Sequence, residues 1–285
     1  MTRPLRLEFP GALYHVTARG NRSSIIFRDD TDRRVWMQNV ALACERHGCV
    51  IHSFCQMGNH YHVMIETRFA NLARAIRHLN GAYSQYFNRR HNIVGHMFQG
   101  RYKAILVQKE SYLLELSRYI VLNPLRANLV RSPENWPWSS YRYFVSKKNP
   151  LPWLERTWLL SQFGTTDAQA IPAFQAFIQA GIGKSSPLTE TRHQVLLGDD
   201  AFVAQHQGTQ TTIKLDETVM AARQALILAL SDYQARYVNR NEAIARAYLS
   251  TAFTMPAIAC HFGVSTRTVS RVVAEFEMAK LHEKG

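Results

Sequence analysis

The sequence predicts an α+β fold, and three observations indicate it. Four segments alternate apolar and polar residues in the manner of β-strands. Three longer segments place apolar residues three and four positions apart, as α-helices do. Along the chain their order is strand, helix, strand, strand, helix, strand, helix. This order is typical of a ferredoxin-like, split βαβ antiparallel sheet domain, with helices on one face and the other face left open.

The strand segments end at turn residues. The predicted strands cover residues 13–19, 49–56, 60–66 and 101–108. The first is rich in aromatic and β-branched residues and ends at Gly20-Asn21. Gly58-Asn59 connects the second strand directly to the third, so these two should form an antiparallel hairpin.

The helical segments also have clear ends. The predicted helices cover residues 30–47, 71–90 and 111–122. In the first, Val35, Trp36 and Val40 define an apolar face, and Gly48 follows the end. The third should stop at Asn123-Pro124, because proline has no backbone N–H and clashes with the preceding turn.

Composition points to a nucleic-acid partner. The formal net charge is +13 and the pI about 9.9, so the chain should be attracted to a polyanion. No apolar run has the length of a membrane span, and the N-terminus lacks the apolar core of a signal peptide. The four cysteines lack the Cys-x-x-Cys spacing of a zinc site. We therefore expect a cytoplasmic protein with reduced thiols.

Two histidines one residue apart are the strongest chemical signal. His60 and His62 lie in a predicted strand, so their side chains share one face. Two imidazoles can hold a divalent metal ion, which polarises a bound phosphate oxygen. Paired histidines on a strand can instead be solvated or hydrogen-bonded core residues, and the pair alone does not decide between these interpretations.

A second signal lies in the third predicted helix. Tyr119 and Asn123 are four residues apart and share a face. A tyrosine hydroxyl can attack a phosphodiester covalently, and the Asn123 carboxamide oxygen could be a third metal ligand. Such a mixed nitrogen and oxygen set suits Mg²⁺ or Mn²⁺. Alternatively, Tyr119 packs in the core and Asn123 caps the helix.

The C-terminal region carries a helix-turn-helix pattern at about residues 255–275. Gly263 supplies the turn between two apolar, helically spaced segments. The residues predicted to face a DNA groove are Thr266, Arg267, Thr268 and Arg271. The alternative is a helical hairpin that merely packs on the first domain.

Taken in order, the motifs resemble the HUH single-tyrosine transposases, in which U is a hydrophobic residue, and among them the REP-associated tyrosine transposases. The resemblance covers about the first half of the chain. It rests on Gly58-Asn59-His60-Tyr61-His62, Phe98-Gln99-Gly100-Arg101-Tyr102-Lys103, Tyr119-Ile120-Val121-Leu122-Asn123-Pro124-Leu125-Arg126-Ala127 and Trp136-Pro137-Trp138-Ser139-Ser140-Tyr141.

The resemblance implies a metal-dependent single-stranded DNA endonuclease and strand transferase. It implies that His60, His62 and Asn123 bind the divalent ion and that Tyr119 is the nucleophile. Cleavage beside a repetitive extragenic palindrome hairpin would leave a 5′-phosphotyrosine and a free 3′-hydroxyl. The resemblance favours a monomer over a dimer, and the C-terminal helix-turn-helix is expected to contact duplex DNA.

The predicted organisation follows from these motifs. Residues 1–150 form the transposase-like catalytic domain, residues 151–215 a linker and helical connector, and residues 216–285 a helical domain. The predicted DNA contacts of the first domain are Arg101, Lys103, Arg118 and Arg126.

Two other functions remain open. A non-catalytic DNA-binding regulator would use the first domain as a hairpin platform. A metal-dependent hydrolase would use activated water instead of Tyr119.

Overall fold

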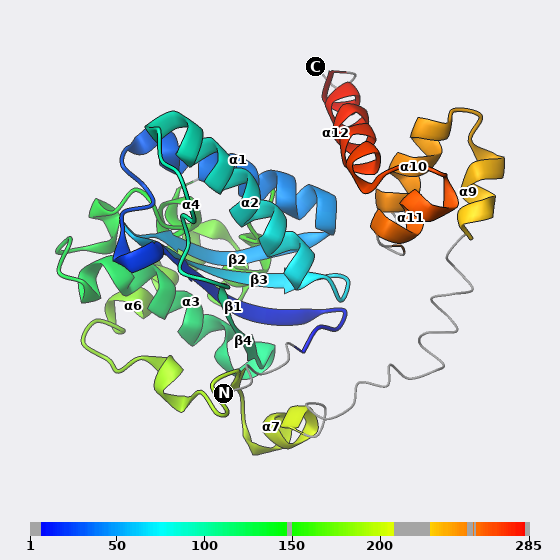
Figure 1. The fold of residues 1–285 in the computed structure, drawn as a ribbon. Helices are drawn as coiled ribbons and strands as arrows, with labels where there is room; N and C mark the ends of the chain where they lie inside the picture. Colours follow the sequence, from blue (N-terminus) through cyan, green and yellow to red (C-terminus); the bar gives the residue numbers. More distant parts are fainter. Residues whose placement is uncertain (1–6, 147–149, 208–228, 250–252, 254, 283–285) are drawn as a thin grey trace. The chain divides into compact units, whose positions relative to one another are not determined.

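The computed structural model describes residues 7–146, 150–207, 229–249, 253 and 255–282. The chain divides into two compact units between Thr211 and Thr212, and each is described by itself (Figure 1).

The first unit is built on a five-stranded sheet in the order β2-β3-β1-β4-β5. The pairs β2–β3, β3–β1 and β1–β4 are antiparallel, so the predicted split βαβ arrangement is confirmed for four strands. The prediction of a purely antiparallel sheet is wrong at one edge, where the short β5 runs parallel to β4. The strands are β1 (Ala12–Arg19), β2 (Cys49–Gln56), β3 (His60–Thr67), β4 (Lys103–Val107) and β5 (Leu196–Leu197).

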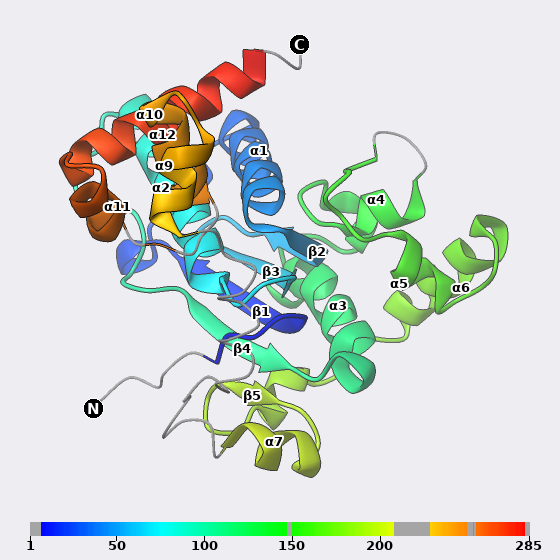
Figure 2. The same cartoon turned by 90° about the vertical axis from the view of Figure 1, so that its right-hand side faces the viewer.

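Helices α1 (Asp30–His47) and α2 (Leu72–His91) pack together over one face of the sheet (Figures 1 and 2). Asp29 caps the first turn of α1 through its side chain, and Gly48 ends the helix at a φ of 64°. Trp36 of α1 is fully buried, with its ring centroid 4.9 Å from that of Tyr61 in β3. The odd-numbered residues of β3 therefore anchor this face.

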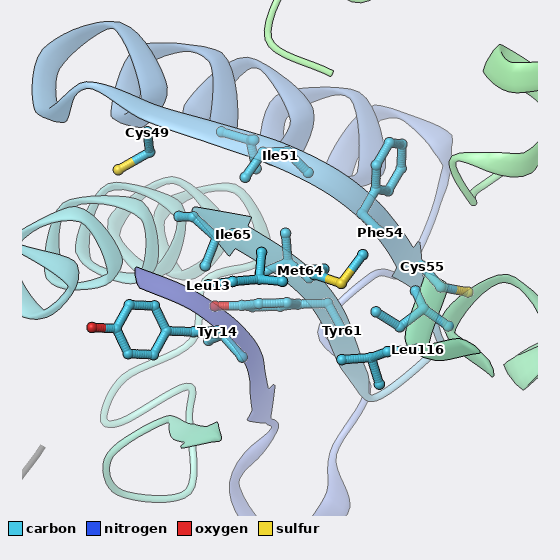
Figure 3. Close-up of a cluster of buried hydrophobic side chains, with 14 of the residues drawn as sticks. Leu13, Tyr14, Cys49, Ile51, Phe54, Cys55, Tyr61, Met64, Ile65 and Leu116 are labelled. Atoms are coloured by element: carbon cyan, nitrogen blue, oxygen red, sulfur yellow. The ribbon is translucent and has the colours of Figure 1, made fainter. Parts of the chain in front are cut away.

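Helix α3 (Lys109–Arg126) covers the opposite face, which the sequence had predicted to be open. It packs on β2 and β3 and lies on the side of the sheet away from α1 and α2 (Figure 2). Leu116 of α3 and Met64 of β3 are both completely buried in the cluster drawn in Figure 3. This second layer adds to the predicted architecture and places the tyrosine helix against the histidine strand.

The predicted end of α3 at Asn123-Pro124 is also wrong, because the helix continues to Arg126. Pro124 cannot donate the hydrogen bond that the Ile120 carbonyl would otherwise accept. The Asn123 side chain supplies substitute donors: its Nδ2 lies 2.9 Å from the Tyr119 carbonyl and 3.4 Å from that of Ile120. The Asn123 amide thus compensates for the missing donor of Pro124, and the helix continues past the proline.

The outer edge of β2 is covered by later chain. The Gln56 N–H donates to the Trp138 carbonyl at 2.9 Å, and the Ser140 N–H donates to that of Phe54 at 2.9 Å. Further along, the Glu155 N–H donates to the Ile51 carbonyl at 2.7 Å. The Trp-Pro-Trp-Ser-Ser-Tyr motif therefore satisfies a sheet edge that would otherwise be open to another chain.

Residues 151–207 of the predicted linker and connector, 151–215, contribute to the same hydrophobic core as the sheet, and residues 208–215 lie outside the described residues. Phe174 and Ile178 of α6 are buried. The Arg118 side chain of α3 packs so closely on Gly181 that a Cβ at that position would collide with it. The remaining elements of the unit are η1 (Asn21–Ser23), η2 (Pro133–Asn135), α4 (Tyr141–Val145), α5 (Thr157–Ser161), α6 (Asp167–Gln179), η3 (Pro187–Glu190) and α7 (Asp200–Gln207).

The second unit has its own small core of apolar side chains. Ile258, Phe262 and Val269 are buried, and Gly263 lies between α11 and α12 at a φ of 64°. Its helices are α9 (Leu230–Arg236), α10 (Arg240–Leu249), α11 (Met255–His261) and α12 (Thr266–His282). In neither unit do the described residues include a helix with the length and apolarity that a membrane crossing requires.

An ion cluster ties the start of α3 to the sheet. Glu66 of β3 accepts from Lys109 Nζ at 2.9 Å, and its Oε2 lies 2.7 Å from His52 Nε2 of β2. The hydrogen bond to His52 and then that from Lys109 outweigh burial and lower the pKa of the Glu66 carboxyl from 4.5 to about 2.

Replacing Phe174 by Ala should lower the free energy of unfolding of the first unit by about 3–5 kcal/mol, because the side chain is 1% exposed. All five tryptophans lie between residues 36 and 158, so tryptophan fluorescence in urea reports on this unit alone. Phe69→Ala, at 54% exposure, is the matched control and should cost less than about 1 kcal/mol. Equal effects of the two changes would show that residues 151–207 do not support the core.

Replacing Glu66 by Gln should destabilise the first unit by about 1–2 kcal/mol at pH 7, after allowance for solvent screening of the partly exposed carboxyl. The folded-state pKa is depressed, so this stability is present above pH 4.5 and is lost as the pH falls toward 2. Urea unfolding at pH 7 and pH 3 should show the difference from wild type shrinking at the lower pH. Glu110→Gln serves as the control on an exposed α3 carboxylate, and a pH-independent loss in Glu66→Gln would refute the linkage.

Candidate active site

Strand register brings six polar side chains together on the α3 face of the sheet. Thr17 of β1 lies directly between His62 of β3 and Lys103 of β4, and Arg19 lies opposite His60. Because side chains alternate along a strand, residues two apart share a face. The six residues are His15, Thr17, Arg19, His60, His62 and Lys103.

Hydrogen bonds orient both imidazoles of the predicted metal pair. His60 Nδ1 lies 2.7 Å from Asn59 Oδ1, and Asn59 Nδ2 donates to the Ser23 carbonyl at 3.2 Å. The Asn59 oxygen can only accept, so His60 carries its proton on Nδ1. His62 Nδ1 lies 3.0 Å from His15 Nε2, and the two rings are parallel within 4°. Within the described chain no hydrogen bond engages Nε2 of either His60 or His62.

Burial keeps these imidazoles neutral. It lowers the pKa of His15 to about 4. Burial, with Arg19 nearby, lowers the pKa of His60 to about 4. For His62, burial and then the neighbouring His15 and His60 depress the pKa well below 6.5. Neutral imidazoles are the form that ligates a metal.

The donor set fits a divalent ion only in part. The rings of His60 and His62 have centroids 5.0 Å apart at an angle of 78°, and within the described residues neither Nε2 has a hydrogen bond. The described residues contain no group of three or more His, Cys, Asp or Glu side chains placed to hold a metal. A metal at this pair would need further oxygen ligands, from Asn123, water or a substrate phosphate.

The structure brings Tyr119 to the histidines. Its half-buried ring meets those of His62 and His15 edge-on, with centroid separations of 6.1 and 6.5 Å. The Arg126 guanidinium lies 5.3 Å from the centre of the Tyr119 ring. A tyrosine, two metal-competent imidazoles and a cation therefore meet on one face.

Asn123 is held by its own helix and has no hydrogen bond to His60 or His62. Both contacts of its Nδ2 are with carbonyl oxygens, which fixes the orientation of the amide. Only Oδ1 is left to act as a ligand.

The four predicted DNA-binding cations of this unit have different environments. Arg101, Lys103 and Arg126 are exposed, but Arg101 precedes β4, although the sequence predicted a strand from residue 101. Arg118 is 5% exposed; its guanidinium pairs with Glu115 and lies 4.3 Å from the centre of the Phe177 ring. The prediction that Arg118 contacts DNA is therefore withdrawn in favour of a structural role.

A cavity of about 360 Å³ adjoins the end of α3, and Arg126 and Lys184 help to line it. Arg126 Nη1 donates to the Lys184 carbonyl at 2.7 Å, which joins this wall to the tyrosine helix.

Sequence reasoning missed His15, Arg19 and Lys184. His15 lies two residues from Thr17 in a segment correctly predicted as a strand, so alternation alone placed it on the same face as Arg19. The missing information was the register between β1 and β3, which joins residues about 45 positions apart. Lys184 lies in a segment that gave no periodic signal.

In the second unit, Thr266, Arg267 and Arg271 are exposed on α12. Thr268 is half-buried, and its N–H donates to Ser265 Oγ at 3.1 Å as part of the helix cap. Arg271 and Glu275 form a long, exposed ion pair at 3.8 Å.

A solved chain described as "Structure of the REP associates tyrosine transposase bound to a REP hairpin" is 15% identical, with a TM-score of 0.45. The similarity covers 55% of this chain and 98% of that one. No curated protein matches the sequence.

Residues 9–123 match the profile of a family described as "Transposase IS200 like". The matched segment contains His60, His62 and Tyr119 and ends at Asn123. Through this segment, which spans β1 to most of α3, the chain is similar to IS200-like transposases.

Proposed function

We propose that the protein is a metal-dependent single-stranded DNA endonuclease and strand transferase with Tyr119 as its covalent nucleophile. The observation that carries the proposal is the edge-on approach of the Tyr119 ring to His62, 6.1 Å between centroids, on the face where both imidazoles keep Nε2 for a ligand. The match of residues 9–123 to the IS200-like transposase family supports DNA processing of the transposase kind. The substrate we propose is single-stranded DNA beside a repetitive extragenic palindrome hairpin.

His60 and His62 would hold a Mg²⁺ or Mn²⁺ ion, with Asn123 Oδ1 as an additional ligand. When bound, the ion makes the scissile phosphate more electrophilic. Asn59 holds His60 in the tautomer that leaves Nε2 unprotonated, and His15 holds the orientation of the His62 ring through Nδ1. His15 is therefore a positioning residue for His62.

The Tyr119 oxygen would attack the phosphorus and form a P–O bond as the bond to the 3′-oxygen breaks. The tyrosine proton is released, and the departing 3′-oxygen takes up a proton. The products are a 5′-phosphotyrosine and a free 3′-hydroxyl, and attack by another 3′-hydroxyl reverses the step. Strand transfer follows because the energy of the phosphodiester is kept in the covalent bond.

The surrounding cations suit a polyanionic substrate. Arg19 and Lys103 flank the histidines, while Arg126 and Lys184 lie at the end of α3. Among the described residues none of these four side chains is paired with a carboxylate, so phosphates of the bound strand can meet them.

The second unit would bind duplex DNA as a helix-turn-helix. Its support is the shared core of α11 and α12 together with the exposed positions of Thr266, Arg267 and Arg271. Thr268 contributes mainly to the cap of the helix. We propose that the whole protein acts as a monomer.

Tyr119→Phe should abolish the covalent protein–DNA adduct and reduce cleavage at least ~1000-fold, because the nucleophile is lost. The assay is denaturing electrophoresis of the protein with a labelled hairpin oligonucleotide and Mn²⁺. Tyr112→Phe, on the same helix with its hydroxyl bonded to Glu190, should keep wild-type adduct formation. Cleavage that persists without Tyr119 would favour the water-activating hydrolase, and binding without an adduct in any variant would favour the regulator.

His60→Ala and His62→Ala should each reduce Mn²⁺-dependent cleavage by more than about 100-fold, because either change removes one of two imidazole ligands. EDTA should abolish the wild-type activity. Isothermal titration with Mn²⁺ gives a second readout and should show weaker binding in both variants. His193→Ala changes an exposed histidine and is the control; unchanged Mn²⁺ binding and cleavage in all three variants would exclude this metal site.

A further inference from the structure

A second cavity, of about 620 Å³, lies between α2 and the connection to β4. Its α2 wall includes Arg77, Asn80 and Ser84, and its other wall includes Phe98, Arg101 and Tyr102. We refer to it as the α2 cleft. Its volume is within the range of sites for small molecules and of the size of a nucleotide or two.

The α2 cleft is cationic. Arg77 and Arg101 contribute exposed guanidinium groups from its two walls, and no Asp or Glu lines it. Within the described chain neither arginine forms an ion pair. Two unneutralised cations facing one cleft are suited to phosphate.

Its walls also offer an aromatic surface and hydrogen-bonding groups. Phe98 and Tyr102 are both partly buried, which gives a base a fixed platform on which to stack. Asn80 Oδ1 accepts the Tyr61 hydroxyl proton at 2.7 Å, so its Nδ2 group is the part that can donate to a ligand. This combination of cations, rings and an amide is typical of sites for unpaired nucleotides.

The α2 cleft is linked through the sheet to the α3 face, which carries His60 and His62. Tyr61, which donates to Asn80, stands between His60 and His62 and points to the opposite face. The Phe98 ring packs at right angles to that of Tyr61, with 6.3 Å between centroids. The Gln99 N–H donates to the Arg19 carbonyl at 2.8 Å. Both walls of the cleft therefore contact the strands that carry the proposed metal ligands and Arg19.

We propose that the α2 cleft binds one unpaired nucleotide of the DNA substrate, at a position outside the cleaved bond. Its base stacks on Phe98 or Tyr102, and its phosphates meet Arg77 and Arg101. This inference rests on the proposed function, because it takes single-stranded DNA as the ligand, but it concerns binding and involves no covalent step.

The test uses the full chain and a DNA hairpin with two single-stranded arms, with 2-aminopurine placed in turn at each arm position. In wild type, fluorescence should be quenched at one or two adjacent positions, where the base stacks on an aromatic ring. The Arg77→Ser/Arg101→Ser double variant should bind at least about tenfold more weakly. The plot of the logarithm of its association constant against the logarithm of salt concentration should have a slope about 1.4 less negative than that of wild type, because two phosphate contacts are lost.

Arg89→Ser is the matched control, since Arg89 is an exposed arginine of α2 that does not line the cleft. It should keep the wild-type affinity and quenching pattern. Equal affinity, salt slope and quenching in the double variant and the control would overturn the proposal. Both exposed arginines can be replaced without disturbing the core, so binding can be compared in folded proteins.

The covalent adduct, measured at saturating DNA, separates this inference from the proposed function. Loss of affinity in the double variant while wild type forms no adduct would support the cleft and reject the tyrosine chemistry. Adduct formation with unaltered affinity in the double variant would reject the cleft alone.

Discussion

The packing of α3 against the sheet is the constraint on which the site depends. Leu116 and Met64 are completely buried in this interface, and the His52–Glu66–Lys109 cluster fastens the start of the helix. Further along the same helix, Tyr119 meets the His62 ring. Without this layer the histidines would face solvent, and no nucleophile would stand beside them. A buried interface fixes the approach more tightly than a surface loop could.

The site is also organised before any ligand arrives. Asn59 sets the tautomer of His60, His15 orients the His62 ring, and burial keeps both rings neutral. The cost of orienting the ligands is thus met during folding rather than at binding. Asn123 has a double role in this scheme, since its Nδ2 repairs the helix at Pro124 while Oδ1 remains for a ligand.

Much of this could be predicted from local patterns. The predicted bounds of α1 and β2 agree with the structure, and strand alternation placed His60 and His62 on one face. What failed depended on contacts between distant residues. The partnership of His15 with His62 requires the β1–β3 register, and the burial of Arg118 requires the Phe177 helix to pack on α3. The end of α3 was predicted too early because the Asn123 side-chain amide replaces the backbone donor that Pro124 lacks.

The most direct measurement is peptide mapping, by tandem mass spectrometry, of the complex trapped with Mn²⁺ and a hairpin oligonucleotide. The chain has 12 tyrosines, so the position of the nucleotide adduct is decisive. We expect a 5′-phosphodiester on Tyr119 and on no other tyrosine. An adduct on a different residue, or cleaved DNA with no modified peptide, would contradict it.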